Sequence, residues 1–189
     1  ELSMFLSIPA TIALIISSEE IVSALFGYGS FSEDSVFNSA KALYFFAIGL
    51  PAFALIKVFS SFFFASHNTK TPFYISLISV ILNISISLYY FKNIGFIIIP
   101  IATSISSWFN SIVLFLFLKR EKIFRFNESF FIKLFKIIFA SIFMGFILNF
   151  AISLFENKLV YNYDFKLFYL LLCVLLGLMF YLIICFFIK

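Results

Sequence analysis

One ionisable side chain lies within an otherwise apolar segment, and its chemistry is the first question that the sequence raises. Lys57 lies inside the run Leu-Pro-Ala-Phe-Ala-Leu-Ile-Lys-Val-Phe at residues 50–59. It precedes the polar bend at 66–71 by about eight residues, or roughly 12 Å of helix at 1.5 Å per residue. If the run crosses a membrane, such a lysine costs on the order of 2.5–3.5 kcal/mol and usually faces a cavity or a partner. The alternative is a lysine whose stem reaches back to phosphate headgroups, and the sequence leaves both open.

Small polar residues accompany Lys57, whereas the residue clusters of enzymes do not. Ser60 and Ser61 follow on the same helical face, one turn further along. The single histidine, His67, has no cysteine or carboxylate cluster beside it that would make a metal site or a catalytic triad. The sequence also has no glycine loop of the kind that cradles phosphate. We therefore expect neither an enzyme, nor a metal, nor a cofactor.

The composition identifies the solvent of this chain as lipid. Of its 189 residues, 63% are hydrophobic and 12% are charged, with a mean hydropathy of +1.14. Soluble domains have about 25% charged and about 45–50% apolar residues. No soluble core of this size hides so much apolar surface, so the chain is an integral membrane protein. The net charge of +4 is too small and too confined to loops to indicate a nucleic-acid partner.

Apolar runs of membrane-spanning length define the predicted fold. A span needs about 20 mainly apolar residues. Six runs meet or approach that length, at residues 2–18, 40–65, 72–91, 95–118, 134–155 and 165–188. They predict an all-α, polytopic bundle of six transmembrane helices without a soluble domain. The first run is short, so we expect the chain to be the C-terminal piece of a longer membrane protein.

The connections between the runs are polar, and two of them carry structural signals. We expect a long loop from Glu19 to Ser39 and a tight connection at Lys92-Asn93. Pro72 is expected at the first helical position of its run, where a missing N–H is tolerated.

Loop charges predict the orientation in the membrane. On one side lie Lys70, Lys119, Arg120, Lys122, Arg125, Lys133, Lys136 and Lys189. On the other lie Lys41, Lys92, Lys158 and Lys166 among Glu19, Glu20, Glu33, Asp34, Glu156 and Asp164. The positive-inside rule places the first set, and with it the C-terminus, in the cytosol. The basic loop at 119–133 is explained by the same rule.

Several runs carry stripes of small or polar residues at helical spacing. The stripes are Ser3, Ser7 and Thr11; Ser76, Ser79, Asn83 and Ser87; Thr103, Ser107 and Asn110; and Ser141, Gly145, Asn149 and Ser153. Such faces let membrane helices pack closely, with hydrogen bonds of typically about 0.6 kcal/mol each. The alternative interpretation is that some of them, with Asn83 as a candidate, line a polar cavity for a substrate headgroup.

A series of motifs along the chain resembles a known family of transporters. The motifs are Ile-Pro-Ala-Thr at 8–11, Ile-Val-Ser-Ala-Leu-Phe-Gly-Tyr-Gly-Ser-Phe at 21–31, Ala-Ile-Gly-Leu-Pro-Ala-Phe at 47–53, Lys-Val-Phe at 57–59, and Phe-Phe-Ala at 63–65 followed by Asn68, Thr69, Lys70, Thr71 and Pro72. In this order they resemble the C-terminal half of the MurJ (MviN) family of lipid II flippases, within the multidrug/oligosaccharidyl-lipid/polysaccharide exporter superfamily. Asn68 replaces the aspartate usual in that family and Phe64 replaces a tyrosine, so no role of that carboxylate carries over.

The resemblance implies a function that the residues alone do not reveal. It implies the last six of fourteen spans in the bacterial cytoplasmic (inner) membrane, with the rest of the transporter in a missing N-terminal lobe. It implies alternating access that moves lipid II, the undecaprenyl-linked peptidoglycan precursor, to the outer leaflet. Lys57, Ser60, Ser61 and Asn83 would then face the substrate cavity, and Asn68 to Pro72 would form a cytosolic bend. The last two spans would form a groove for the lipid tail.

Other functions fit the same features. One is another lipid-linked oligosaccharide or polysaccharide flippase of the superfamily; a drug antiporter fits the bend at 68–72 less well. A different class is a membrane scaffold that binds a partner through the basic loop, and Lys57 argues against it. The discriminating feature is the N-terminal half, where a lipid II flippase supplies several arginines.

Overall fold

The chain forms helices throughout the part that the structure describes. The structure is a computed structural model, and it describes residues 2–121, 128–161 and 163–187. The elements are α1 (Leu2–Ile16), α2 (Ser18–Phe26), α3 (Glu33–Ala65), α4 (Lys70–Ile94), the 3-10 turn η1 (Gly95–Ile97), α5 (Ile98–Arg120), α6 (Glu128–Leu154), the 3-10 turn η2 (Glu156–Lys158) and α7 (Lys166–Phe187).

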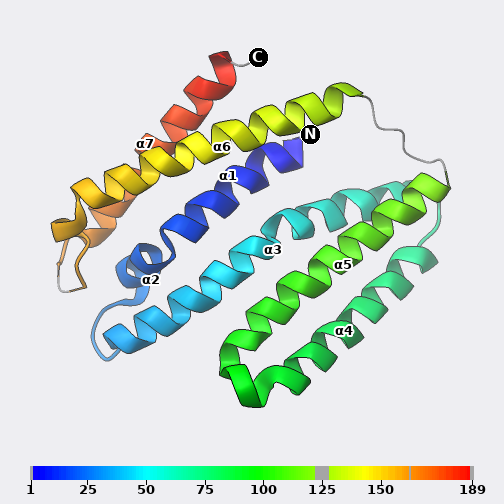
Figure 1. The fold of residues 1–189 in the computed structure, drawn as a ribbon, viewed down its shortest axis with the longest axis horizontal. Coiled ribbons are helices and arrows are strands. Elements are labelled where there is room, and N and C mark those ends of the chain that lie inside the picture. Colours follow the sequence, from blue (N-terminus) through cyan, green and yellow to red (C-terminus); the bar gives the residue numbers. More distant parts are fainter. Residues whose placement is uncertain (1, 122–127, 162, 188–189) are drawn as a thin grey trace.

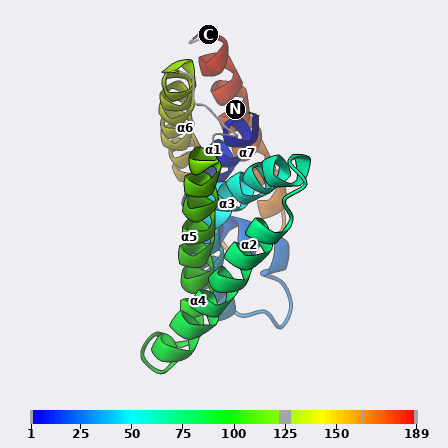
Figure 2. The ribbon, with the colours of Figure 1, turned by 90° about the vertical axis from the view of Figure 1, so that its right-hand side faces the viewer.

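The long helices lie side by side in a single row (Figure 1). Their order in space is α7, α6, α1, α3, α5, α4, with contacts between each neighbouring pair. Figure 2 looks along this row from the end formed by α4 and α5. Large apolar side chains remain exposed along the helices. A single row of helices has little interior, so much of its apolar surface stays exposed.

The helices confirm the predicted all-α membrane bundle. Helices α3, α6 and α7 are each long and apolar enough to cross a membrane, as is the stretch Lys70–Arg120. That stretch reverses at Gly95, which has a φ of 74°, and therefore supplies both α4 and α5. Helices α1 and α2 form a bent pair with an angle of 76° and qualify only together. The six predicted runs thus correspond to α1, α3, α4, α5, α6 and α7.

The expected loop at 19–39 is wrong over much of its length. Residues Ser18–Phe26 form α2, and α3 begins at Glu33 rather than near Ala40. Acidic residues explain both helices, because carboxylates in a first turn are stabilised by the helix dipole. The α3 start is also capped, since the Ser32 hydroxyl accepts a hydrogen bond from the Ser35 backbone N–H at 3.3 Å.

Two further local expectations are corrected at α4. Pro72 is the third residue of this helix, not the first, and it is still in the first turn, where backbone N–H groups have no helical partner. Lys92 and Asn93 belong to the end of α4 and do not form the connection. The reversal occurs at Gly95 instead, because its positive φ is readily adopted only by glycine.

Helices α3 and α5 cross closely at Gly49. A Cβ added to Gly49 would lie 2.8 Å from the Ser104 Oγ and 3.1 Å from its Cα. At the same crossing, the Ser104 hydroxyl donates to the Phe45 carbonyl at 2.6 Å, and the Trp108 Nε1 donates to the Ile48 carbonyl at 3.0 Å. Side chains of α5 therefore bind the backbone of α3 directly, which only a small residue such as Gly49 permits.

A buried lysine joins two connections at the ends of the helices that lie opposite the bend between α3 and α4. Lys166 is 1% exposed, whereas the sequence predicts it among the loop residues on that side of the membrane. Its Nζ donates to the carbonyls of Gly27 and Tyr161, both at 2.7 Å, and lies 4.2 Å from the centre of the Tyr28 ring. The Tyr161 hydroxyl in turn donates to the Phe31 carbonyl. The α6–α7 connection is thereby fastened to the α2–α3 connection.

We expect Gly49→Ala to destabilise the protein by about 1–3 kcal/mol, because the added methyl group overpacks the α3–α5 crossing. The matched control is Gly177→Ala in α7, where the added Cβ would meet its nearest atom at 3.7 Å, an ordinary contact. The measurement is the free energy of unfolding in mixed detergent micelles. Equal stabilities of the two variants would contradict this account of the crossing.

Candidate functional site

Two of the polar stripes meet where α4 packs against α5. The Asn83 side-chain amide donates to the Thr103 hydroxyl at 3.0 Å and to the Ser106 hydroxyl at 3.3 Å. Seven residues before Asn83 on α4, the Ser76 hydroxyl accepts a hydrogen bond from the Asn110 amide at 3.4 Å. The stripes predicted on these two helices therefore face each other and share their hydrogen bonds.

A groove of about 350 Å³ runs over this polar contact. Its lining residues are Phe53 and Ile56 of α3, Ser76, Ser79, Val80 and Asn83 of α4, and Thr103, Ser106, Ser107 and Asn110 of α5. Asn110 is 7% exposed, and its Oδ1 has no hydrogen-bond partner among the described residues. Leaving such an acceptor unpaired costs about 1–3 kcal/mol, and in this arrangement of the helices water does not reach the oxygen.

Lys57 lies beside this groove and does not line it. It follows Phe53 by one helical turn on the same side of α3. Its side chain is exposed, and its ammonium makes no hydrogen bond or ion pair within the described ranges. Sequence places no other charged residue between Lys41 and Lys70. Lys57 is thus an uncompensated cation at the edge of a polar groove.

The other predicted cavity residues are divided between groove and flank. Asn83 lines the groove, as described. Ser60 is half-buried on α3 and is outside the lining. Ser61 is exposed, and its hydroxyl donates to the Lys57 carbonyl at 2.8 Å, a hydrogen bond within α3 itself. Of the four residues, the structure brings only Asn83 into direct contact with the polar cluster.

The bend between α3 and α4 has a defined hydrogen-bond pattern. His67 adopts a φ of 57°, and its N–H donates to the Phe64 carbonyl at 3.0 Å. The Asn68 N–H donates to the Phe63 carbonyl at 2.9 Å. A left-handed residue with these two bonds is the Schellman motif that ends many helices.

Asn68, just before α4, caps the start of that helix with its side chain. Its Oδ1 accepts from the Thr71 backbone N–H at 3.1 Å, and its Nδ2 donates to the Thr71 hydroxyl at 2.9 Å. Thr69 and Lys70 are exposed at the start of α4, and Pro72 is buried. The side chain at 68 is therefore a helix cap, a role for which asparagine and aspartate are equally suited.

An apolar pocket of about 510 Å³ lies between α1, α6 and α7. Phe5, Ala13, Met144, Gly177 and Tyr181 are among its lining residues. The α1 stripe contributes to packing beside it, since Ser7 and Thr11 are buried and Thr11 donates to the Ser7 carbonyl at 2.8 Å. In the α6 stripe, Ser141 is buried and Asn149 is exposed.

Three residues that the sequence did not indicate form hydrogen bonds between helices. Ser104 and Trp108 bind the α3 backbone, and Ser106 accepts from Asn83. The segment Thr-Ser-Ile-Ser-Ser-Trp at 103–108 contains the signal, because its hydroxyl groups cover more than one helical face. Which hydroxyl meets a neighbouring helix depends on the position of that helix, which the spacing does not specify.

Comparisons with known proteins identify relatives of the chain. Residues 1–184 match the family model described as "Lipid II flippase MurJ". A protein of Thermotoga maritima named "Probable lipid II flippase MurJ" is 40% identical over 143 residues, which is 76% of this chain and 28% of that protein. A protein of the same name from Rickettsia prowazekii is 38% identical over 109 residues, 58% of this chain and 22% of that protein.

A solved structure is similar over nearly the whole fold. It is titled "Lipid II flippase MurJ, inward closed conformation" and matches with a TM-score of 0.79 and 25% sequence identity. The match covers 96% of this chain and 36% of that chain. The chain therefore spans about a quarter to a third of the length of the relatives that it matches.

We expect Asn68→Ala to lower the free energy of unfolding by about 1 kcal/mol, because Thr71 loses the acceptor that caps its helix. Asn68→Asp retains that acceptor and is expected to stay within about 0.5 kcal/mol of the wild type. Unfolding in mixed micelles measures both variants. A loss of equal size in both would show that capping is not the role of this side chain.

Proposed function

The chain belongs to the MurJ family of lipid II flippases, and we propose that it acts as part of a transporter that moves lipid II to the outer leaflet of the bacterial cytoplasmic membrane. The family is one of membrane transporters, which agrees with the apolar helices of this chain. The substrate would be the undecaprenyl-linked peptidoglycan precursor. The solved relative is almost three times longer than the part that matches, and in this proposal other chain segments would supply the remainder of the transporter.

The polar groove beside Lys57 is the observation that carries this proposal beyond family membership. The groove brings ten residues together, seven of which are serine, threonine or asparagine, in helices whose exposed large side chains are mostly apolar. A membrane lysine without a partner usually faces a substrate or ion pathway. Lys57 would supply positive charge for the pyrophosphate of lipid II, and Asn83 and Asn110 would provide hydrogen-bonding groups beside it. Ser60 and Ser61 extend the polar flank of α3.

Alternating access supplies the mechanism in this proposal. Membrane transporters of this kind rock two halves of the molecule around a central site. The helices described here would form most of one lobe, with the N-terminal lobe of the transporter as its partner. The polar groove would then alternate between the two sides of the membrane as the lobes move. A close relative solved in an inward closed state is in agreement with such a cycle.

The apolar pocket and the loop charges complete the proposal. The pocket between α1, α6 and α7 would receive the hydrocarbon tail while the headgroup lies near Lys57. Basic residues at the bend and after α5 would place that end of the helices, and the C-terminus, in the cytosol. Of the basic residues predicted on this side, Lys122, Arg125 and Lys189 lie outside the described residues.

The family assignment favours lipid II over the other substrates considered. A different lipid-linked oligosaccharide would need the same groove, and the relatives that match carry the name of a lipid II flippase. A scaffold that binds a partner through its basic loop gives no reason for a lysine within an apolar helix beside a polar groove, so Lys57 favours a transporter.

We expect Lys57→Glu to lower the rate of lipid II translocation by about tenfold or more, equivalent to about 1.4 kcal/mol, because it places negative charge beside the pyrophosphate. Lys57→Arg keeps the charge and is expected to remain active. The measurement is the appearance of lipid II in the outer leaflet of cells that depend on the variant of the full-length protein.

The matched control is Lys92→Glu, which makes the same charge change in the last turn of α4, away from the groove lining. We expect this variant to translocate lipid II normally. A Lys57→Glu protein that supports the wild-type rate at equal expression would exclude a role for this lysine in translocation.

A further inference from the structure

Helix α1 contains a proline within its apolar stretch, and this proline deprives one backbone carbonyl of its usual helical partner. Pro9 is buried inside α1. In an α-helix, the N–H of each residue donates to the carbonyl four positions earlier, and proline has no N–H. The carbonyl that position 9 would otherwise bind is that of Phe5. An unpaired carbonyl is costly in a membrane, because the hydrocarbon region has no water to bind it.

The hydroxyl of Tyr181 in α7 supplies a hydrogen bond to this carbonyl. Its oxygen donates to the Phe5 carbonyl at 2.8 Å, and the ring centres of the two residues are 5.2 Å apart. Tyr181 is 4% exposed, so the hydrogen bond is shielded by the neighbouring helices. In the row of helices, α6 lies between α7 and α1 (Figure 1). Tyr181 therefore joins two helices that are not neighbours in the row.

Phe5 and Tyr181 lie at one end of the apolar pocket between α1, α6 and α7. The part of α1 that lines this pocket runs from Phe5 to Ser17, and the part of α7 runs from Val174 to Leu182. The two aromatic residues are thus at the end of the pocket nearest the start of α1, and their contact bridges it there. The position of the start of α1 therefore sets the width of the pocket at this end.

The start of α1 has space on its other side as well. Ser3 and Met4 line a further apolar pocket of about 330 Å³, together with residues of α3, α5 and α6 such as Leu55 and Phe115. The segment of α1 before Pro9 accordingly lies between two apolar pockets. A movement of this segment would enlarge one pocket at the expense of the other.

The part of α1 after Pro9 is packed more tightly. A Cβ added to Gly145 of α6 would lie 2.7 Å from the Ile12 Cγ2 and 2.9 Å from the Ile16 Cδ1. Helix α6 therefore approaches this part of α1 as closely as a glycine permits. Sharp bends in helices occur mostly at prolines. Pro9 thus separates a tightly packed part of α1 from the segment that lies between the two pockets.

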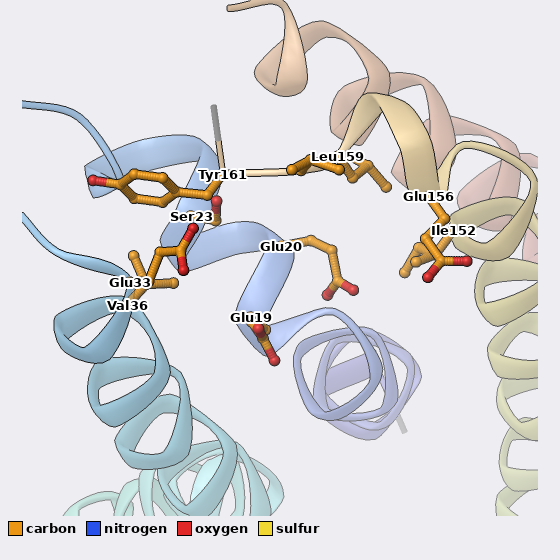
Figure 3. Close-up of a pocket in the computed structure, with 10 residues that line it drawn as sticks. Glu19, Glu20, Ser23, Glu33, Val36, Ile152, Glu156, Leu159 and Tyr161 are labelled. Atoms are coloured by element: carbon orange, nitrogen blue, oxygen red, sulfur yellow. The ribbon is translucent and has the colours of Figure 1, made fainter. Parts of the chain in front are cut away.

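The far end of α1 is fixed through α2. Helix α1 turns into α2 at an angle of 76°. Figure 3 shows α2 between the first turns of α3 and the end of α6, and four glutamates line a pocket of about 320 Å³ there: Glu19, Glu20, Glu33 and Glu156. Ala24 of α2 is buried against Leu159 and Leu170. The freedom to move therefore belongs to the residues of α1 before Pro9.

We propose that Tyr181 is a positioning residue whose hydrogen bond to the Phe5 carbonyl, here called the latch, holds residues 2–8 of α1 across the apolar pocket. Pro9 is the pivot of this segment, and it also keeps its own helix from satisfying the carbonyl. When the latch breaks, the segment moves toward the pocket lined by Ser3 and Met4, and the pocket between α1, α6 and α7 widens. The effect on a hydrocarbon tail rests on the function proposed above, whereas the latch itself does not.

A double-mutant cycle in the full-length protein tests the latch. Tyr181→Phe removes the hydroxyl and keeps the ring, and Pro9→Ala restores an N–H that can bind the Phe5 carbonyl. We expect Tyr181→Phe to lower the free energy of unfolding in mixed micelles. That loss is expected to fall by at least half when residue 9 is alanine, because residues that share a partner do not act additively.

Two matched variants serve as controls for the cycle. Pro51→Ala changes the proline of α3 and is expected to leave the loss caused by Tyr181→Phe unchanged. Tyr89→Phe removes an exposed hydroxyl from α4 and is expected to unfold as the wild type does. A loss of equal size with proline and with alanine at position 9 would overturn the proposal.

Distances between spin labels on α1 and α7 test the movement. Labels replace Leu2 and Phe186, which are both exposed, in the full-length protein in nanodiscs with its native cysteines changed to alanine. We expect Tyr181→Phe to add a population with a longer distance between the labels. Pro9→Ala/Tyr181→Phe is expected to lack it, because the Phe5 carbonyl is then satisfied within α1. A distance distribution that Tyr181→Phe leaves unchanged would overturn the proposal.

Translocation of lipid II separates the latch from the proposed function. If the pocket receives the hydrocarbon tail, we expect Tyr181→Phe to slow translocation severalfold and Pro9→Ala/Tyr181→Phe to recover most of the rate. A longer label distance in Tyr181→Phe together with a wild-type rate would support the latch and contradict the role of the pocket in binding the tail.

Discussion

The close crossing of α3 and α5 is the contact on which the rest of the structure depends. Lipid provides no hydrophobic force to hold helices together, so association relies on close packing and hydrogen bonds between helices. Gly49 lets Ser104 and Trp108 reach the α3 backbone. With α5 held in this way, its opposite polar stripe is presented to α4, and the groove containing Asn83 forms beside Lys57.

The connections at the two ends of the helices are stabilised in different ways. At the bend between α3 and α4, a Schellman motif and the Asn68 cap keep the connection short without any contribution from charge. At the other end, two carbonyls and an aromatic ring replace water around the Lys166 ammonium, which offsets part of the cost of burying the charge.

Lys57 and the glutamates lie toward different ends of the helices. Lys57 lies toward the bend, beside a groove suited to a polar headgroup, whereas the glutamates line a pocket at the far end. Between them the apolar pocket of α1, α6 and α7 has almost no polar lining. In a flippase, this separation would let the anionic headgroup and the hydrocarbon tail occupy different surfaces of the same row of helices.

The sequence by itself determined the features that depend on local chemistry. Composition identified the membrane, apolar run lengths predicted the six long helices, and residues 66–72 predicted the bend. Tertiary structure decided which polar stripes meet, that Asn83 lines the groove while Lys57, Ser60 and Ser61 flank it, and that Lys166 is buried. It also revealed the short helix α2, in a segment whose acidic residues had indicated a loop. Spacing specifies a helical face, but the partner of that face comes from distant segments, and only packing brings them together.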